Sequence, residues 1–194
     1  MVAGILEAAG TATVPISITG MTAQAGWWRG LQVGSGGTAV LQFCDIGYGG
    51  SPNDVPNIAL YASNVIVQDC RLHHSAGAGI ELFDRAIAFI NRNRIEQDGF
   101  GMRAPGLRLV DARNNWWGHA SGPHDAARNP QGTGKAVNEY VLFEPLLRTP
   151  NATTMAALKM LVQGAQTFAP GSPRSMRLFG TTTPRRRCET RCWW

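Results

Sequence analysis

The chain has 194 residues, of which 44% are apolar, 23 are glycine and 11 are proline. This length suits one domain or a domain with a tail, and the glycine and proline content favours many turns and short strands over a helical protein. No stretch approaches the ~20 apolar residues of a membrane-spanning helix, so no membrane span is expected. The opening stretch MVAGILEAAGTATVP also lacks the basic and apolar regions of a secretory signal.

The net charge of +5 lies at the C-terminal end of the chain. Residues 1 to 150 carry 11 Lys and Arg against 12 Asp and Glu, a net charge of −1, whereas residues 151 to 194 carry 7 against 1, a net charge of +6. Steering of a polyanion needs a concentrated field, and a near-neutral body does not supply one. We therefore expect no nucleic-acid partner.

Short segments with alternating apolar residues recur along the chain. They are GLQVG (30 to 34), NIALY (57 to 61), GIELF (79 to 83) and GMRAP (101 to 105). The alternation predicts strands of three to five residues with one apolar face, formed by Leu31, Val33, Ile58, Leu60, Ile80, Leu82, Met102 and Ala104. The opposite face then presents Gln32, Ala59, Glu81 and Arg103.

A second set of segments lies between these strands: AVLQFCDI (39 to 46), VIVQDCRL (65 to 72), AFINRNRI (88 to 95) and VDARNNWW (110 to 117). Their anchor residues Cys44, Cys70, Asn93 and Asn115 are spaced by 26, 23 and 22 positions. A period of about 22 residues made of short strands is typical of a parallel β-solenoid, in which equivalent residues stack about 4.8 Å apart. We expect Asn93 and Asn115 to form an amide ladder at a sharp turn whose left-handed backbone Asn tolerates.

Cys44 and Cys70 fall in the same predicted inward column. Stacked positions come close to the 4.4 to 6.8 Å Cα separation of disulfides. The pair is therefore either two buried thiols or a disulfide between coils.

These repeats resemble the right-handed parallel β-helix proteins of the pectin-lyase-like superfamily. The resemblance rests on WWRGLQV (27 to 33), FCDIGYGG, DCRLHHSAGAGIEL and the closing NNWWGHASGP followed by VLFEPLL, and GILEAAGTATVPISITG (4 to 20) is similar to an earlier coil of such proteins. It covers residues 4 to about 147 and is specific for the fold, whereas one fold serves many activities. It implies an all-β solenoid of about five coils and an extracellular or cell-surface bacterial protein.

The resemblance also divides the chain into two parts. Residues 1 to 147 form the β-helix with its C-terminal cap, in which Trp116 and Trp117 cover the open end of the stack. Residues 148 to 194 are predicted to hold a short helix within 151 to 166, capped by Thr153 or Thr154, and a basic, mostly disordered tail. The first coil has no evident cap, so its edge is a candidate surface for self-association.

Enzymes of this superfamily act on polysaccharide along the outer face of one parallel sheet, and the matching column here is Gln32, Ala59, Glu81 and Arg103. The candidate catalytic residues are therefore Glu81, Asp84, His74 and Arg103, and the candidate substrate-binding residues are Gln32, Tyr61, Phe83 and Arg85. Calcium needs six to eight oxygen ligands, and two acids supply too few, so no cofactor is expected and Ca²⁺ is poorly supported.

His73 and His74 are interpreted first as polar turn residues, and His119, His124 and Asp125 as turn residues beside the cap rather than as a metal site. The leading hypothesis is a non-catalytic scaffold module of a bacterial secreted or surface protein with glycan contact. The alternative is a carbohydrate-active enzyme, a polysaccharide lyase or a glycoside hydrolase, acting on that same face. The acid clusters of polygalacturonase-like hydrolases are missing from the sequence, which favours the scaffold.

Overall fold

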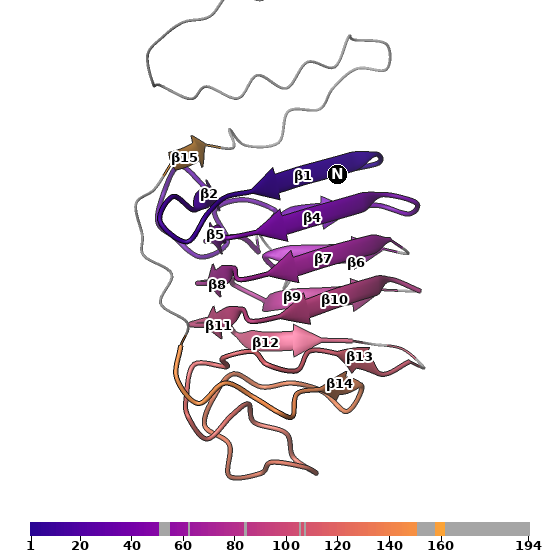
Figure 1. Cartoon of the computed structure of the whole chain (residues 1–194), viewed down its shortest axis with the longest axis vertical. Coiled ribbons are helices and arrows are strands. Elements are labelled where there is room, and N and C mark those ends of the chain that lie inside the picture. Colours follow the sequence, from indigo (N-terminus) through magenta and orange to yellow (C-terminus); the bar gives the residue numbers. More distant parts are fainter. Residues whose placement is uncertain are drawn as a thin grey trace, which may run out of the picture.

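The computed structural model describes residues 1–50, 55–61, 63–83, 85–104, 106, 108–150 and 158–161. Within these ranges the protein is a parallel β-solenoid without a helix, as the repeat predicts. Figure 1 shows the strands stacked as successive turns, with β1 at one end and the cap loops at the other. The chain makes three full turns between β1 and β10, against the predicted total of about five coils.

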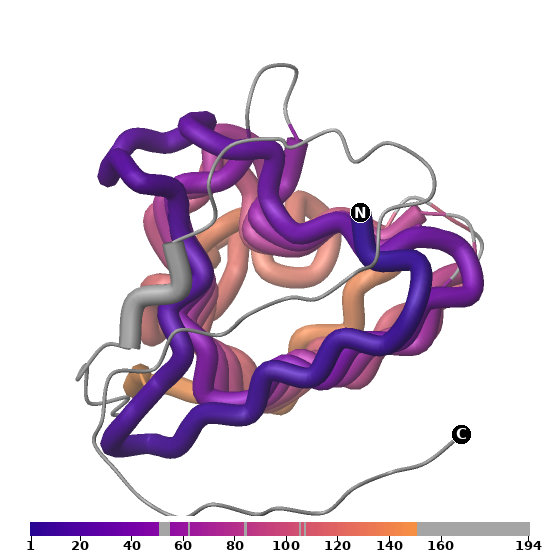
Figure 2. The backbone as a smooth tube through the Cα atoms, turned by 90° about the horizontal axis from the view of Figure 1, so that it is seen from above, coloured from indigo at the N-terminus to yellow at the C-terminus, as the bar shows by residue number. Residues whose placement is uncertain are grey.

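Three parallel sheets form the sides of the solenoid, and each receives one strand per turn (Figure 2). Sheet A contains β3 (Leu31–Val33), β6 (Ile58–Tyr61), β9 (Ala78–Phe83) and β12 (Phe100–Arg103). Sheet B contains β1 (Ile5–Ala9), β4 (Thr38–Gln42), β7 (Asn64–Gln68) and β10 (Ile87–Asn91). Sheet C contains β2 (Ile16–Thr19), β5 (Cys44–Gly47), β8 (Arg71–His73), β11 (Arg94–Glu96) and β15 (Leu158–Leu161). A small sheet pairs β13 (Val110–Asp111) with β14 (Val141–Leu142).

The predicted register is confirmed in sheet A. Leu31, Ile58 and Ile80 are aligned across β3, β6 and β9, and Met102 pairs with Ile80. Apart from half-buried Leu31, the inward residues of this sheet are at most 5% exposed. They pack with the inward residues of the other two sheets into one core, which removes apolar surface from water along the whole stack.

The anchor column forms a hydrogen-bonded ladder at the corner between sheets B and C. The backbone N–H of Cys70 donates to Oδ1 of Asn93 at 2.9 Å, and the N–H of Asn93 donates to Oδ1 of Asn115 at 2.8 Å. Cys44 and Cys70 are free thiols, and the N–H of Cys44 lies 3.4 Å from the Cys70 sulfur. The stacking of Asn93 and Asn115 is therefore confirmed, but each side chain bonds backbone groups rather than the other side chain, and the cysteines that extend the column are not bridged.

The left-handed residue of each corner is not the asparagine itself. It is the residue before each anchor, with φ between 49° and 58° at Phe43, Asp69, Arg92 and Asn114. A left-handed residue is needed because the chain turns sharply there, and the following side chain is then directed inward to serve the ladder. Attributing the left-handed backbone to Asn93 and Asn115 was wrong by one position.

Trp117 closes the stack as predicted. It is fully buried, follows Ile95 in the core column and packs with Val137, Val141 and Phe143. Its backbone C=O accepts a 2.7 Å hydrogen bond from Lys135, which fixes the cap loop over the last turn. Trp116 is half-buried and pairs with Arg94 through a parallel bridge.

The prediction of a helix within residues 151 to 166 is wrong for residues 158 to 161. These residues form β15, which pairs in parallel with β2. The edge of β2 offers backbone hydrogen-bonding groups that a strand can satisfy and a helix cannot, which outweighs the weak helical pattern. The rest of that segment, including Thr153 and Thr154, and the basic tail lie outside the described residues. Among the described residues no helix could span a membrane.

Candidate functional site

Sheet A brings the predicted outward column together. Gln32, Ala59 and Glu81 are aligned on adjacent strands, and Arg103 pairs with Glu81 in register. Nη1 of Arg103 lies 4.0 Å from Oε2 of Glu81, and the guanidinium carbon lies 4.7 Å from the centre of the Phe100 ring. The Glu81 side chain is only 13% exposed, and Ala59 is fully buried. Glu81 is therefore one half of an ion pair between adjacent turns.

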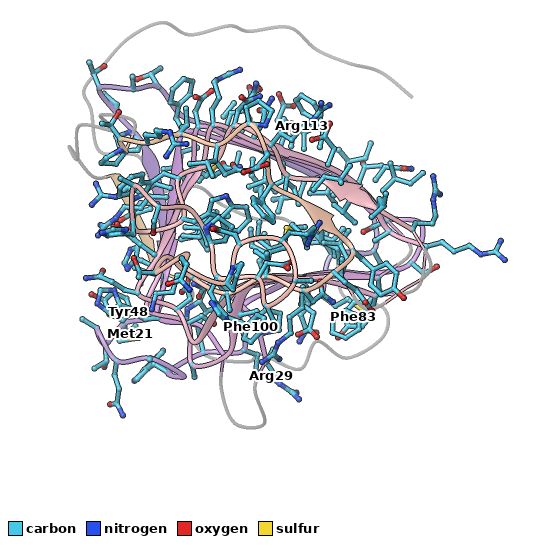
Figure 3. The ribbon with its side chains drawn as sticks, turned by 90° about the horizontal axis from the view of Figure 1, so that it is seen from below. Met21, Arg29, Tyr48, Phe83, Phe100 and Arg113 are labelled. Carbon is cyan, nitrogen blue, oxygen red and sulfur yellow. The ribbon has the colours of Figure 1, made fainter. Side chains whose placement is uncertain are left out.

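An aromatic pair lies at the ends of the same strands. Tyr61 and Phe83 stack with ring centres 4.6 Å apart and planes 8° apart, which is an offset-stacked geometry expected of neighbouring rungs. Both rings are half-buried, and Arg85 beyond them is exposed. Figure 3 places Phe83 and Phe100 on the same side of the solenoid, opposite Arg113. Asp84 lies outside the described residues.

His74 belongs to a different assembly. Its Nδ1 lies 2.7 Å from Nδ1 of His73, and its ring stacks on Tyr48 with centres 4.9 Å apart. This corner joins sheets C and A, and Figure 3 labels Tyr48 there. The structure thus pairs Glu81 with Arg103 on sheet A, whereas the described contacts of His74 are with other residues at the corner.

Asp45 completes the histidine cluster from the outer face of sheet C. Its Oδ1 lies 3.1 Å from Nε2 of His73 and 3.7 Å from Nη1 of Arg71, and it has no hydrogen bond of good geometry among the described residues. The His73 ring lies so close against Gly47 that a side-chain carbon on residue 47 would overlap it. Glycine at position 47 is thus what allows the buried imidazole to lie flat on the sheet.

Charge neutralisation extends this cluster to the next turn. Nε of Arg71 donates to Glu96 at 3.1 Å, and Nε of Arg94 lies 2.8 Å from the other Glu96 oxygen. Burial raises the pKa of Glu96, but hydrogen bonds and charges from Arg94 and Arg71 outweigh burial and lower the pKa overall. Partial burial, followed by the charges of His73 and Arg71, lowers the pKa of His74. Both effects favour the neutral form of the His74 imidazole.

A buried carboxyl group, Asp98, escaped the sequence reasoning altogether. It is 3% exposed, and its Oδ1 accepts hydrogen bonds from the Ser75 backbone at 2.7 Å and the Asn57 amide at 3.4 Å. Its Oδ2 has no partner among the described atoms. Burial raises the pKa of Asp98 to about 8, so the group is largely protonated at neutral pH.

The sequence did contain a signal for the sheet C cluster. Asp45, Arg71 and Arg94 each follow an anchor residue, so one acid and two bases stand on successive turns of the outer face of sheet C, with Asp45 next to Arg71. Attention to the outward positions of sheet A alone missed them. For Asp98 no comparable signal exists, because it lies in a corner where neighbouring turns differ in sequence.

The residues beside the cap behave as turn residues. Nδ1 of His119 lies 2.8 Å from the Ser121 hydroxyl, and Asp125 accepts backbone N–H groups from Ala127 and Arg128 as well as the Arg128 guanidinium. The hydrogen bond from Arg128 is the main cause of the lowered pKa of Asp125. Within the described part of the chain, no group of three or more His, Cys, Asp or Glu side chains is arranged to hold a metal ion.

Comparison of this chain with protein-family models, with curated proteins and with solved structures finds no match. The assignment that stands is therefore the architecture, a parallel β-solenoid with a capped C-terminal end.

Proposed function

We propose that this chain is a scaffold module of a bacterial secreted or cell-surface protein that contacts glycan, without catalysis, along the outer face of sheet A. The resemblance of its coils to pectin-lyase-like β-helix proteins supports this class of protein and this location. A solenoid of stacked short strands suits the role, because each turn supports the next and the outer face stays rigid.

The pairing of Glu81 with Arg103 is the observation that carries the proposal. Hydrolysis needs two carboxyl groups about 5 to 9.5 Å apart, and lyase chemistry needs an available base with charge stabilisation. The outward column of sheet A holds one carboxylate, and a guanidinium lies 4.0 Å from it. Such a pair suits hydrogen bonding to sugar hydroxyls better than proton transfer.

The residues beside this ion pair offer the aromatic and hydrogen-bonding groups that a sugar ring can contact. Tyr61 and Phe83 supply flat apolar area at the strand ends, and Gln32 supplies an amide two turns from Glu81. Among the described residues of the outward column Glu81 is the one carboxylate, which supplies far fewer than the six to eight oxygen ligands of calcium. We therefore propose direct contact with a polysaccharide.

Binding is tested with a panel of uronate and neutral polysaccharides by affinity electrophoresis. We expect the substitutions Tyr61→Ala and Phe83→Ala to weaken binding. The matched control is Phe89→Ala, because Phe89 is also a half-exposed ring but lies on sheet B. Equal losses in all three variants, or no binding to any glycan by the unaltered protein, would rule out the sheet A surface.

Turnover is measured in the same panel, with and without calcium, from reducing ends and from the absorbance of unsaturated products. We expect none. Activity that disappears in Glu81→Gln would overturn the non-catalytic role and favour the alternative, a polysaccharide lyase or glycoside hydrolase using Glu81, Arg103, His74 and Asp84.

A further inference from the structure

At the corner between sheets C and A, three side chains lie in contact and are here called the corner triad. Nδ1 of His74 lies 2.7 Å from Nδ1 of His73, and Nε2 of His73 lies 3.1 Å from Oδ1 of Asp45. His73 is 5% exposed, whereas His74 is half-buried and stacks on Tyr48, which Figure 3 labels. The triad thus leads from a carboxylate through a buried imidazole to an imidazole at the surface.

The contacts of the corner triad determine which ring nitrogens carry protons. Of the two Nδ1 atoms one must donate and the other accept, since a neutral imidazole has one N–H. A proton on Nε2 of His73 faces the Asp45 carboxylate, whereas a lone pair at that position would be repelled by it. His73 therefore accepts at Nδ1, and His74 donates from Nδ1 and keeps the lone pair on Nε2.

Nε2 of His74 is open to a ligand. It has no hydrogen-bond partner among the described residues, and it is not one of the unpartnered polar atoms that are closed off from solvent. Donation of the opposite N–H to His73 makes Nε2 more basic, as it does for imidazoles that bind metal ions. The corner therefore presents an electron-rich nitrogen to solvent.

His119 at the cap has the opposite arrangement. Its Nδ1 accepts the backbone N–H of Ser121 at 3.2 Å, so the proton of the neutral ring is on Nε2. The His119 side chain is exposed. Two surface imidazoles of one protein thus differ in the nitrogen that carries the lone pair.

We propose that His74, His73 and Asp45 act as nucleophile, general base and orienting carboxylate, and that Nε2 of His74 takes the acyl group of uncharged aryl esters. A nucleophile within about 2.6–3.2 Å of a base that a third group orients is the arrangement shared by covalent catalysts. None of the three residues lies on sheet A. This activity and the proposed glycan contact therefore succeed or fail independently.

The surroundings of the corner triad favour an uncharged substrate. The charged side chains that face it from β5, β8 and β11 are two acids and two bases, namely Asp45, Glu96, Arg71 and Arg94. Their charges balance, so the corner offers no excess positive charge for a phosphate or carboxylate. The Tyr48 ring, stacked on His74 with planes 15° apart, adds flat apolar surface against which an aryl group packs.

Acyl transfer at this site balances in two steps. Nε2 of His74 attacks the ester carbonyl carbon, the aryloxide leaves with the electron pair of its bond to that carbon, and the Nδ1 proton passes to Nδ1 of His73. The His73 imidazolium then faces Asp45. Water next attacks the acyl carbon and the bond to Nε2 breaks. His73 returns its proton to Nδ1 of His74, and one proton of the water enters the solvent as the carboxylic acid leaves.

Release of p-nitrophenolate from p-nitrophenyl acetate by the full chain tests the nucleophile. We expect His74→Asn to lower the rate at least about tenfold, because general-base assistance contributes about 10²–10⁴-fold in enzymes. Asparagine tolerates the left-handed backbone at this position, where φ is 52°. The matched control is His119→Asn, which removes a surface imidazole of the opposite tautomer and should leave the rate unchanged. Equal losses in both variants, or no loss in His74→Asn, would overturn the proposal.

The unaltered protein gives a second test that no variant can compromise by misfolding. Diethyl pyrocarbonate transfers an ethoxycarbonyl group to nucleophilic imidazole nitrogens, and tandem mass spectrometry measures the rate at each histidine. We expect His74 to react at least about tenfold faster than His119. Equal or slower reaction at His74 would contradict the assignment of its Nε2 as the nucleophile.

Asp45→Asn tests the positioning role of the carboxylate through the pH profile of ester cleavage. Burial, followed by the charges of His73 and Arg71, lowers the pKa of His74, and the charge of Asp45 opposes them. Removal of that charge should move the midpoint of the profile to lower pH and reduce the limiting rate, because the His73 imidazolium loses its counter-ion. A reduced rate with an unmoved midpoint would show a structural role alone and remove Asp45 from the triad.

Discussion

Two corners of the solenoid both turn through left-handed residues, but their side chains make different kinds of contact. At the asparagine corner, the column of Cys44, Cys70, Asn93 and Asn115 repeats one kind of contact, in which each side chain after the first accepts the backbone N–H of the turn before it. At the histidine corner the left-handed residues Tyr48, His74 and Gln97 differ in every turn. A side chain that repeats in every turn stabilises the stacking of the turns. A side chain that occurs in one turn alone makes local contacts that stacking does not require.

The largest expected effect is at the asparagine corner. Asn93→Ala leaves the Cys70 N–H buried without its acceptor and removes the 2.8 Å hydrogen bond from Nδ2 of Asn93 to the Val67 carbonyl. The unsatisfied N–H costs about 1–3 kcal/mol and the lost hydrogen bond about 0.5–1.5 kcal/mol, so we expect a loss of about 2–4 kcal/mol in the free energy of unfolding. Denaturant titration measures it.

Two further substitutions sharpen this prediction. Asn64→Ala, at an exposed position on β7, is the matched control and should change stability by less than about 0.5 kcal/mol. Asn93→Cys should cost less than Asn93→Ala, because the cysteines at the two preceding rungs already occupy this column. Equal costs for both Asn93 substitutions would show that the side-chain acceptor contributes nothing.

The next effect is at the histidine corner. Gly47→Ala places a side-chain carbon against Cε1 of His73, well inside van der Waals contact, and the ring must leave its place against the sheet. Overpacking of this kind costs about 1–3 kcal/mol. We expect that loss together with a changed NMR titration of His74, whose Nδ1 partner is displaced.

Gly4→Ala is the control for this substitution, since nothing lies within 4 Å of the added carbon. If Gly47→Ala leaves both the stability and the His74 titration unchanged, the His73 ring is not held by this contact. The two corners would then differ less than their contacts imply.

The sequence predicted what repeats and missed what does not. Period and alternation were enough to place Asn93 over Asn115, Trp117 at the end of the core and Glu81 beside Arg103, because stacking makes neighbours of residues at equal phase. Asp45 and His73 contact each other from non-equivalent positions of two neighbouring turns. The contact also requires glycine at position 47, because the His73 ring lies directly against it. The strand β15 was missed because pairing with β2 depends on an available sheet edge rather than on local pattern.

The histidine corner also contains the group with the clearest pH dependence. Asp98 has a pKa raised from 3.8 to about 8 by burial. Since the folded value lies above the unfolded value, its stabilising contribution is complete below about pH 4 and is lost as the pH rises toward 8. This loss amounts to about 1.4 kcal/mol per pH unit between those limits.

Asp98→Asn isolates this contribution. The amide cannot titrate, so the difference in unfolding free energy between the variant and the unaltered protein should shift in favour of the variant by about 1.4 kcal/mol for each pH unit between about 5 and 7. Any constant cost of the amide, such as an unpaired N–H beside Gly79, contributes an offset and not a slope. Parallel stability curves would mean that Asp98 is ionised in the folded protein.

The smallest expected effect concerns how readily a thiol reagent reaches the cysteines at the asparagine corner. Cys44 and Cys70 are at most 1% exposed, and burial is the main cause of the raised pKa of Cys70, so neither thiol should react with Ellman's reagent in the native protein. With Cys188 and Cys192 replaced by serine, two thiols should appear on unfolding, whereas a disulfide would give none. Asn93→Ala should increase the native reaction rate, because opening of the weakened ladder exposes Cys70 from the adjoining rung. An unchanged rate would mean that the thiols are protected by sheet packing rather than by the ladder.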